Sequence, residues 1–149
     1  MYEDGDGAAR DPAQALAWYD TGLDRGDPWA GTNGARLILR GAAPDATLFD
    51  ATKRAGRAAS LGDGAAATRA HDLLSGLSDQ ALFGGAQALL VDLGADIAVD
   101  GVFGLASLAA LRQQVGAVAA AGLEDRPLDL LLRVAAAHWR SFRFHADLL

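Results

Sequence analysis

The chain has 149 residues, the size of one ordinary domain or of two very small ones, so it can bury only a modest core. Hydrophobic residues make up 51% and charged residues 21% of it, which is typical of a globular protein and not of a disordered one. Its net charge of −6 argues against general attraction to DNA or to an anionic membrane, because such binding requires clustered positive charge. We therefore expect no nucleic-acid partner.

Small side chains dominate the sequence, with 34 Ala and 18 Gly residues. Helices that carry so many small residues can approach closely, and we expect an all-α fold. The absence of cysteine excludes disulfides and Cys-ligated metals. No apolar run approaches the roughly 20 residues of a membrane span, and the acidic N-terminus does not resemble a signal peptide. If the protein is exported, its signal would lie outside this chain, which we interpret as a fragment.

The N-terminal half begins with a predicted helical hairpin. Asp11-Pro12 and Asp27-Pro28 each offer an N-cap followed by proline at the first helical position. Apolar residues follow each start at a helical period until Gly26 and Gly41, and glycine commonly ends helices. The sequence therefore predicts two helices joined by a short turn.

The same pattern recurs with a period of 36 residues. A second hairpin is predicted, with helices at about 44–61 and 63–75, and stacked hairpins of this kind cover each other's apolar faces. The matching positions are Gly5 and Gly41, Ala15 and Ala51, Gly26-Asp27 and Gly62-Asp63, Ala30 and Ala66, Thr32 and Thr68, and Leu37 and Leu73.

The first copy carries the signature of a known repeat in the stretches Tyr2–Gly7, Asp11–Tyr19 and Gly26–Ala30, followed by Asn33. These stretches resemble the Sel1-like repeat, a relative of the tetratricopeptide repeat, with its glycine-bearing loop, its Gln-Ala-Leu turn before Trp-Tyr and its Gly-Asp-x-x-Ala start. The second copy departs from the motif, since Arg54-Ala55 stands where Trp18-Tyr19 did and Gly34 replaces a leucine of the family. The resemblance implies stacked hairpins that bind a protein partner.

Trp18, Tyr19 and Trp29 are the candidate protein-binding residues of these hairpins. Their rings can pack between the repeat helices, or they can be presented to a partner on the concave face that helical repeats form. The sequence leaves both alternatives open.

A second module is predicted after Gly76, where the 36-residue period ends. Residues 79–93 read as an amphipathic helix that ends at Gly94, and a loop over 95–101 precedes another helix at about 105–115. The region between Asp79 and Gly116 resembles a short helical peptidoglycan-binding domain, whose hallmark is Asp-Gly-x-Phe-Gly-Pro-x-Thr-x-x-Ala-Leu.

The resemblance to this domain depends on a motif of five residues, Asp100, Gly101, Phe103, Gly104 and Ser107. In the expected structure Asp100-Gly101 forms a tight turn, Phe103 fills the small core, Gly104 lets the next helix start close by and Ser107 caps or supports the turn. The chain departs from the family at Leu105, which replaces a proline, and at Ser107, which replaces a threonine. The resemblance implies association with murein.

The C-terminal stretch begins at Pro127 as an amphipathic helix and is predicted to end in a tail over 140–145 that tucks onto its own domain. His71, His138 and His145 are the only candidates for acid–base chemistry at neutral pH or for nitrogen ligation of a metal, and no acidic motif accompanies them. Asp92, Asp96 and Asp100 recur every four residues, but Gly94 and Gly101 would separate them. We expect no metal, no cofactor and no catalytic residue.

These patterns predict an all-α chain with Sel1-like hairpin repeats over residues 1–77 and a three-helix peptidoglycan-binding-like module with a C-terminal helix over residues 78–149. The interpretation that follows is a non-enzymatic scaffold or adaptor of the bacterial cell envelope or periplasm, whose repeats bind a protein and whose second module binds murein. Two alternatives remain: an accessory C-terminal region of a larger protease or wall hydrolase, and a purely protein-binding repeat module.

Overall fold

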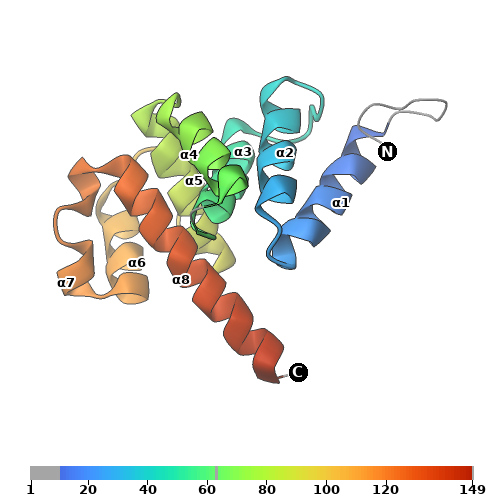
Figure 1. The fold of residues 1–149 in the computed structure, drawn as a ribbon. Helices are drawn as coiled ribbons and strands as arrows, with labels where there is room; N and C mark the ends of the chain where they lie inside the picture. Colours follow the sequence, from blue (N-terminus) through green and yellow to red (C-terminus); the bar gives the residue numbers. More distant parts are fainter. Residues whose placement is uncertain (1–10, 63, 149) are drawn as a thin grey trace.

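A computed structural model describes residues 11–62 and 64–148, the last six of these by their backbone alone (Figure 1). The described residues form eight α-helices and one short 3-10 helix, η1, and contain no strand. The predicted all-α class is therefore confirmed. None of the described helices combines the length and hydropathy needed to cross a lipid bilayer.

The first four helices form two successive hairpins. Helix α1 spans Pro12–Asp24, α2 spans Pro28–Leu39, α3 spans Leu48–Ala59 and α4 spans Ala65–Ser75. The Asp-Pro pairs that open α1 and α2 act as predicted, since each Asp side chain accepts a hydrogen bond from a backbone N–H of the first turn. Helix α3 begins 36 residues after α1, and α4 begins 37 residues after α2. The matched positions Gly5 and Asp63 lie outside the described residues.

The start of α3 differs from the prediction. The sequence predicted a helix from Pro44, but the helix begins at Leu48 because Thr47 and Asp50 form a capping box. The Thr47 hydroxyl accepts from the Asp50 backbone N–H at 3.2 Å, and the Asp50 carboxylate accepts from the Thr47 N–H at 2.8 Å. Two satisfied backbone donors fix the helix start at this position, and Pro44 lies in the preceding turn.

The second half contains α5 at Asp79–Asp92, α6 at Leu105–Val115, α7 at Ala117–Ala120, η1 at Leu123–Asp125 and α8 at Pro127–Leu148. The predicted bounds of α5 and α6 agree with these to within one residue. The predicted tail over 140–145 is wrong, because α8 continues through it. No glycine or proline follows Pro127, so nothing in the local sequence stops the helix.

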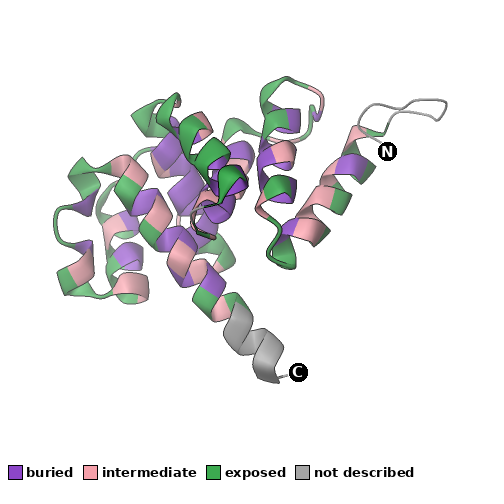
Figure 2. Ribbon diagram, in the orientation of Figure 1, coloured by how far each residue is buried: buried purple, intermediate pink, exposed green. Residues whose placement is uncertain are grey.

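One hydrophobic core joins the two halves of the chain. Helices α3, α5 and α8 all contact one another, and each carries buried residues of one hydrophobic cluster. Buried positions are purple in Figure 2. Among these are Ala55 of α3, Leu90 of α5 and Val134 of α8. Residues on both sides of position 77 therefore share one core, although the sequence patterns of the two predicted modules differ.

The α3–α5 contact depends on glycine. A Cβ atom built on Gly85 would lie 2.4 Å from Cγ2 of Thr52, and one built on Gly84 would lie 2.0 Å from Cδ1 of Phe49. Both distances are far below van der Waals contact. The small residues that the composition suggested thus allow α3 and α5 to pack in direct backbone proximity.

Candidate functional site

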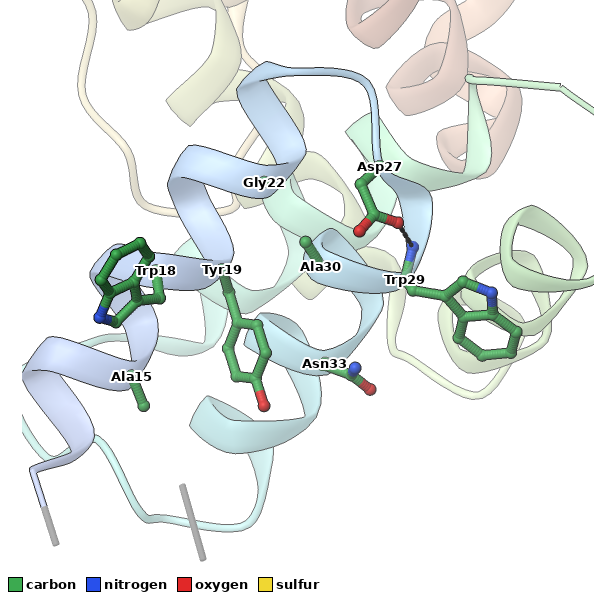
Figure 3. A pocket seen from close by; sticks show the side chains of 8 residues that line it. All are labelled: Ala15, Trp18, Tyr19, Gly22, Asp27, Trp29, Ala30 and Asn33. Carbon is green, nitrogen blue, oxygen red and sulfur yellow. Dashed lines mark hydrogen bonds between the residues drawn. The ribbon is translucent and has the colours of Figure 1, made fainter. Parts of the chain in front are cut away.

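The three candidate aromatic residues line one open groove between α1 and α2 (Figure 3). Trp18 and Tyr19 come from α1, and Trp29 comes from the first turn of α2. The groove has a volume of about 610 Å³. Its other lining residues are Ala15, Gly22, Asp27, Ala30 and Asn33.

The three rings are buried to different extents. Trp18 is 61% exposed and Trp29 is 45% exposed, whereas Tyr19 is half-buried against the small core around Leu23 and Ala30. In Figure 3 the Tyr19 ring lies between the two indole rings. Tyr19 therefore packs between the hairpin helices, while Trp18 presents most of its surface and Trp29 nearly half of its surface to solvent. Large exposed aromatic surface of this kind is typical of binding surfaces.

The floor of the groove forms because α1 and α2 come close together at Gly22. A Cβ atom built on Gly22 would lie 2.8 Å from the Cβ of Ala30, so only glycine allows this approach. The start of α2 is held by Asp27, whose Oδ1 accepts a hydrogen bond from the backbone N–H of Trp29 at 3.0 Å (Figure 3). The backbone that carries Trp29 is thus fixed by capping.

The groove combines aromatic rings with one carboxylate, that of Asp27, and one amide, that of Asn33. Aromatic ring faces bind apolar side chains and attract cations, and a carboxylate adds attraction for a basic group. The amide can donate and accept hydrogen bonds with a peptide backbone. The chemistry of the groove therefore suits a peptide segment with apolar and basic side chains.

Helix α1 is tied to α3 by two ion pairs that the sequence pattern did not reveal. The guanidinium of Arg54 donates to both carboxylate oxygens of Asp20 at 2.7 and 2.8 Å. Arg57 donates to Asp24 at 2.9 Å. Arg54 is the residue that replaces Trp18 in the second copy, so this departure from the repeat motif joins the two hairpins.

The motif residues of the second module surround a buried glutamine, Gln87 of α5. Its Oε1 accepts from the backbone N–H groups of Asp100 and Gly101 at 3.0 and 2.8 Å. Its Nε2 donates to the Val102 carbonyl and to the Ser107 hydroxyl, both at 2.9 Å, and to Oδ1 of Asp100 at 3.2 Å. Three of the five predicted motif residues are therefore engaged in holding the turn against α5.

Of the two remaining motif residues, Phe103 also packs within the fold. The Phe103 ring packs on Phe83, with ring centroids 5.4 Å apart. Gly101 adopts a positive φ of 79°, as a tight turn requires, and a Cβ there would meet Gln80. At Gly104 the expected close approach is not found, since a Cβ built there has no neighbour within 4 Å.

Gln87 was not predicted from the sequence as a structural residue. The available signal was its position, because it is a polar residue on the same helix face as buried Leu90 and would face the core. The pKa of Asp100 is lowered, first by the hydrogen bond from the Val102 backbone N–H and then by that from Gln87. The turn is therefore a closed hydrogen-bonded unit with a carboxylate that stays ionised.

Exposed apolar side chains flank this closed turn. Val102 is 66% exposed and Leu105 is 87% exposed, and Val99 is also exposed. These residues contribute little to the core. They are the part of the motif region that is free to contact a ligand.

Among the other candidates, His138 of α8 and Asp92 of α5 lie close together, with Nε2 of His138 4.0 Å from Oδ2 of Asp92. His71 is exposed on α4, His138 is half-buried on α8, and His145 has no described side chain. Asp92 pairs with Lys53 at 3.3 Å, whereas Asp100 caps the turn described above. No group of three metal-ligating side chains occurs in the described part of the chain.

No protein-family model, curated protein or solved structure matches this chain. The Sel1-like and peptidoglycan-binding resemblances therefore stay predictions made from the residues quoted above.

Proposed function

We propose that this chain is a non-enzymatic binding module of a bacterial cell-envelope scaffold or adaptor, and that the α1–α2 groove binds a segment of a partner protein. The observation that carries the proposal is the exposure of Trp18 and Trp29 at either side of a groove of about 610 Å³. When a ligand covers an exposed indole, a large apolar surface is removed from water, which is favourable. Tryptophan is accordingly enriched among the residues that dominate binding energy at interfaces.

The occupant that fits this groove is a peptide segment with one apolar side chain and a nearby lysine or arginine. The apolar side chain packs on Tyr19 between the two indoles, and the basic group lies over the Trp29 ring near the Asp27 carboxylate. Cation–π and charge attraction then act on the same group. Such a segment binds without a change in the hairpin, because capping and the Gly22 contact already fix the groove.

The test is selection of binders from a random displayed-peptide library, followed by affinity measurement on the variants Trp18→Ala and Trp29→Ala. We expect selected peptides to carry an apolar and a basic residue, and each substitution to weaken binding about tenfold or more. The matched control is Val118→Ala, because Val118 is 93% exposed but lies on α7 away from the groove. Peptides that bind equally well to all variants would contradict the proposal, as would a selection that yields no peptide sensitive to these residues.

We further propose that the second module associates with murein through the exposed residues around the Asp100 turn. Val102 and Leu105 support this proposal, since both are largely exposed, Val102 on the turn held by Gln87 and Leu105 at the start of α6. Sedimentation with purified sacculi is the test, and Val102→Asp with Leu105→Asp should move the protein to the supernatant. Phe103→Ala is a poor probe because Phe103 packs on Phe83. If the unmodified chain stays in the supernatant, the murein role is excluded.

A further inference from the structure

A second groove, separate from the α1–α2 groove, lies along the outer side of α8. It has a volume of about 440 Å³ and is bounded by α7, η1 and α8. Its lining residues are Ala119, Leu123, Arg126, Asp129, Leu132, Arg133, Ala136 and Arg140. The lining thus combines an apolar floor with three arginines and a single carboxylate.

The three arginines recur at intervals of seven residues. Arg126 immediately precedes α8, and Arg133 and Arg140 lie on it. Seven residues correspond to two helical turns, so Arg133 and Arg140 point to the same side of α8, about 10 Å apart along its axis. Arg126 precedes the helix and lines the same groove. The three guanidinium groups therefore form a single row, which we call the arginine row.

The arginine row is largely unpaired. Arg133 and Arg140 are exposed and make no ion pair with any described residue, and Arg126 lies 3.7 Å from Asp129 with both side chains 59% exposed. By contrast, Arg54 and Arg57 are mostly buried and paired with aspartates. The arginine row therefore concentrates positive charge locally in a chain whose net charge is −6.

We infer that the arginine row is a docking site for an acidic amphipathic helix of a partner protein. Carboxylates spaced by seven residues on such a helix match the spacing of the arginines, and each arginine can bind a carboxylate through two N–H groups. The apolar residues between these carboxylates pack on Leu132 and Ala136, which are half-buried along the floor. Charge sets the orientation of the helix, and the apolar floor adds contact area.

A phosphate polymer or nucleic acid fits this groove less well. Asp129 lies within the row, between Arg126 and Arg133, and would repel an evenly charged polyanion. The net charge of −6 repels such a polymer at longer range as well. A peptide helix can place a neutral or basic residue opposite Asp129, and so it avoids this repulsion.

The test uses a labelled synthetic helix of about three heptads with three glutamates spaced by seven residues and leucines between them. Its isomer has the same composition with the glutamates spaced by five residues, which places them on different sides of the helix. Fluorescence anisotropy with the full chain should show binding of the first peptide and affinity for the isomer about tenfold weaker. Added salt should weaken the binding, since the contacts are exposed charges.

Charge reversal in the protein provides the second arm of this test. Arg133→Glu with Arg140→Glu should abolish binding, and Arg133→Lys with Arg140→Lys should retain part of it. The control is Arg36→Glu with Arg69→Glu, two exposed arginines on α2 and α4 whose reversal changes the net charge equally. Equal binding of the two peptides, equal loss in the control, or tighter binding of a polyphosphate at the same arginines would each overturn the inference. Trp18 and Trp29 do not line this groove. A negative result in this experiment would therefore not contradict the proposed peptide binding in the α1–α2 groove.

Discussion

At the scale of single residues, the buried side chain of Gln87 has a large structural role. Its amide group makes five hydrogen bonds to the segment over 100–107, and its side chain is buried. A buried amide that satisfies several polar groups is costly to remove, because its buried partners, Gly101 and Ser107, lose a hydrogen bond without gaining water. Gln87 therefore makes most of the side-chain hydrogen bonds that hold the loop between α5 and α6.

Replacing Gln87 by alanine is expected to lower the free energy of unfolding by about 3 kcal/mol, from lost hydrogen bonds and from the cavity that remains. Urea denaturation followed by circular dichroism measures this change. The matched control is Gln80→Ala, because Gln80 is exposed and makes one hydrogen bond to the Asp100 carbonyl at 3.2 Å. Its expected cost is below about 1 kcal/mol, and similar costs for the two variants would argue against the role assigned to Gln87.

At the scale of elements, the crossing of α3 and α5 leaves no room for an added methyl group. Gly85→Ala places a Cβ 2.4 Å from Thr52 Cγ2 and 3.2 Å from the Thr52 backbone carbon, so the helices must move apart. The overpacking outweighs the roughly 1 kcal/mol that alanine gains in helix propensity, and we expect a net loss of about 2 kcal/mol in unfolding free energy. Thermal and urea denaturation would measure it.

Gly76→Ala is the control for this substitution. Gly76 has an ordinary φ of −88°, and the nearest atom to an added Cβ is 3.6 Å away. Its substitution should change the unfolding free energy by less than about 0.5 kcal/mol. If Gly85→Ala were equally well tolerated, the close approach of α3 and α5 would be wrong.

The contact of α8 with α3 and α5 is expected to make stability depend on pH through His138. Burial lowers the pKa of His138 below its usual 6.5, Arg57 and Lys53 lower it further, and Asp92 and Asp24 oppose the shift. The folded chain therefore keeps this imidazole neutral in a range of pH where the unfolded chain protonates it. This group therefore leaves the free energy of unfolding at its full value above pH 6.5. The free energy of unfolding falls as the pH decreases from 6.5 toward the lowered pKa.

His138→Gln is expected to remove this part of the pH dependence, because glutamine does not titrate. The measurement is the free energy of unfolding at a series of pH values below 6.5. His71→Gln, at an exposed position on α4, is the control and should keep the original slope. An unchanged slope in His138→Gln would show that other groups cause the pH dependence.

Local signals in the sequence predicted most helices, and the errors have local causes too. Asp11-Pro12 and Asp27-Pro28 predicted α1 and α2 because capping depends on adjacent residues. The prediction of a helix start at Pro44 was wrong because the capping box that begins three residues later, at Thr47, determines the helix start. The predicted C-terminal tail over 140–145 is wrong, since the stretch contains no glycine or proline to end the helix.

The candidate sites were only partly predictable. The exposed indoles belong to a pattern visible in the sequence, but their meeting in one groove depends on how α1 and α2 pack. The Arg54–Asp20 pair joins residues 34 positions apart, and the hydrogen bonds of Gln87 reach up to 20 positions along the chain. Such long-range pairs have no periodic signature, so only the structure reveals them.

At the scale of the whole molecule, helix α8 contacts the first half of the chain through Trp139. The indole N–H of Trp139 on α8 donates to the Arg57 carbonyl of α3 at 2.9 Å, in a buried position. The Arg57 guanidinium lies 4.5 Å from the centre of the same ring. These contacts and the shared core couple α3 of the first half to α5 and α8 of the second half.

This coupling predicts a single cooperative unfolding transition. In the variant Trp18→Phe with Trp29→Phe, Trp139 is the only tryptophan, so its fluorescence reports the α8–α3 contact while circular dichroism reports all helices. The two urea midpoints should coincide. A fragment of residues 78–149 should remain largely unfolded, because α5 and α8 would expose the apolar surface that α3 covers in the whole chain. Two separate transitions, or a folded fragment, would instead show that the two modules are independent folding units.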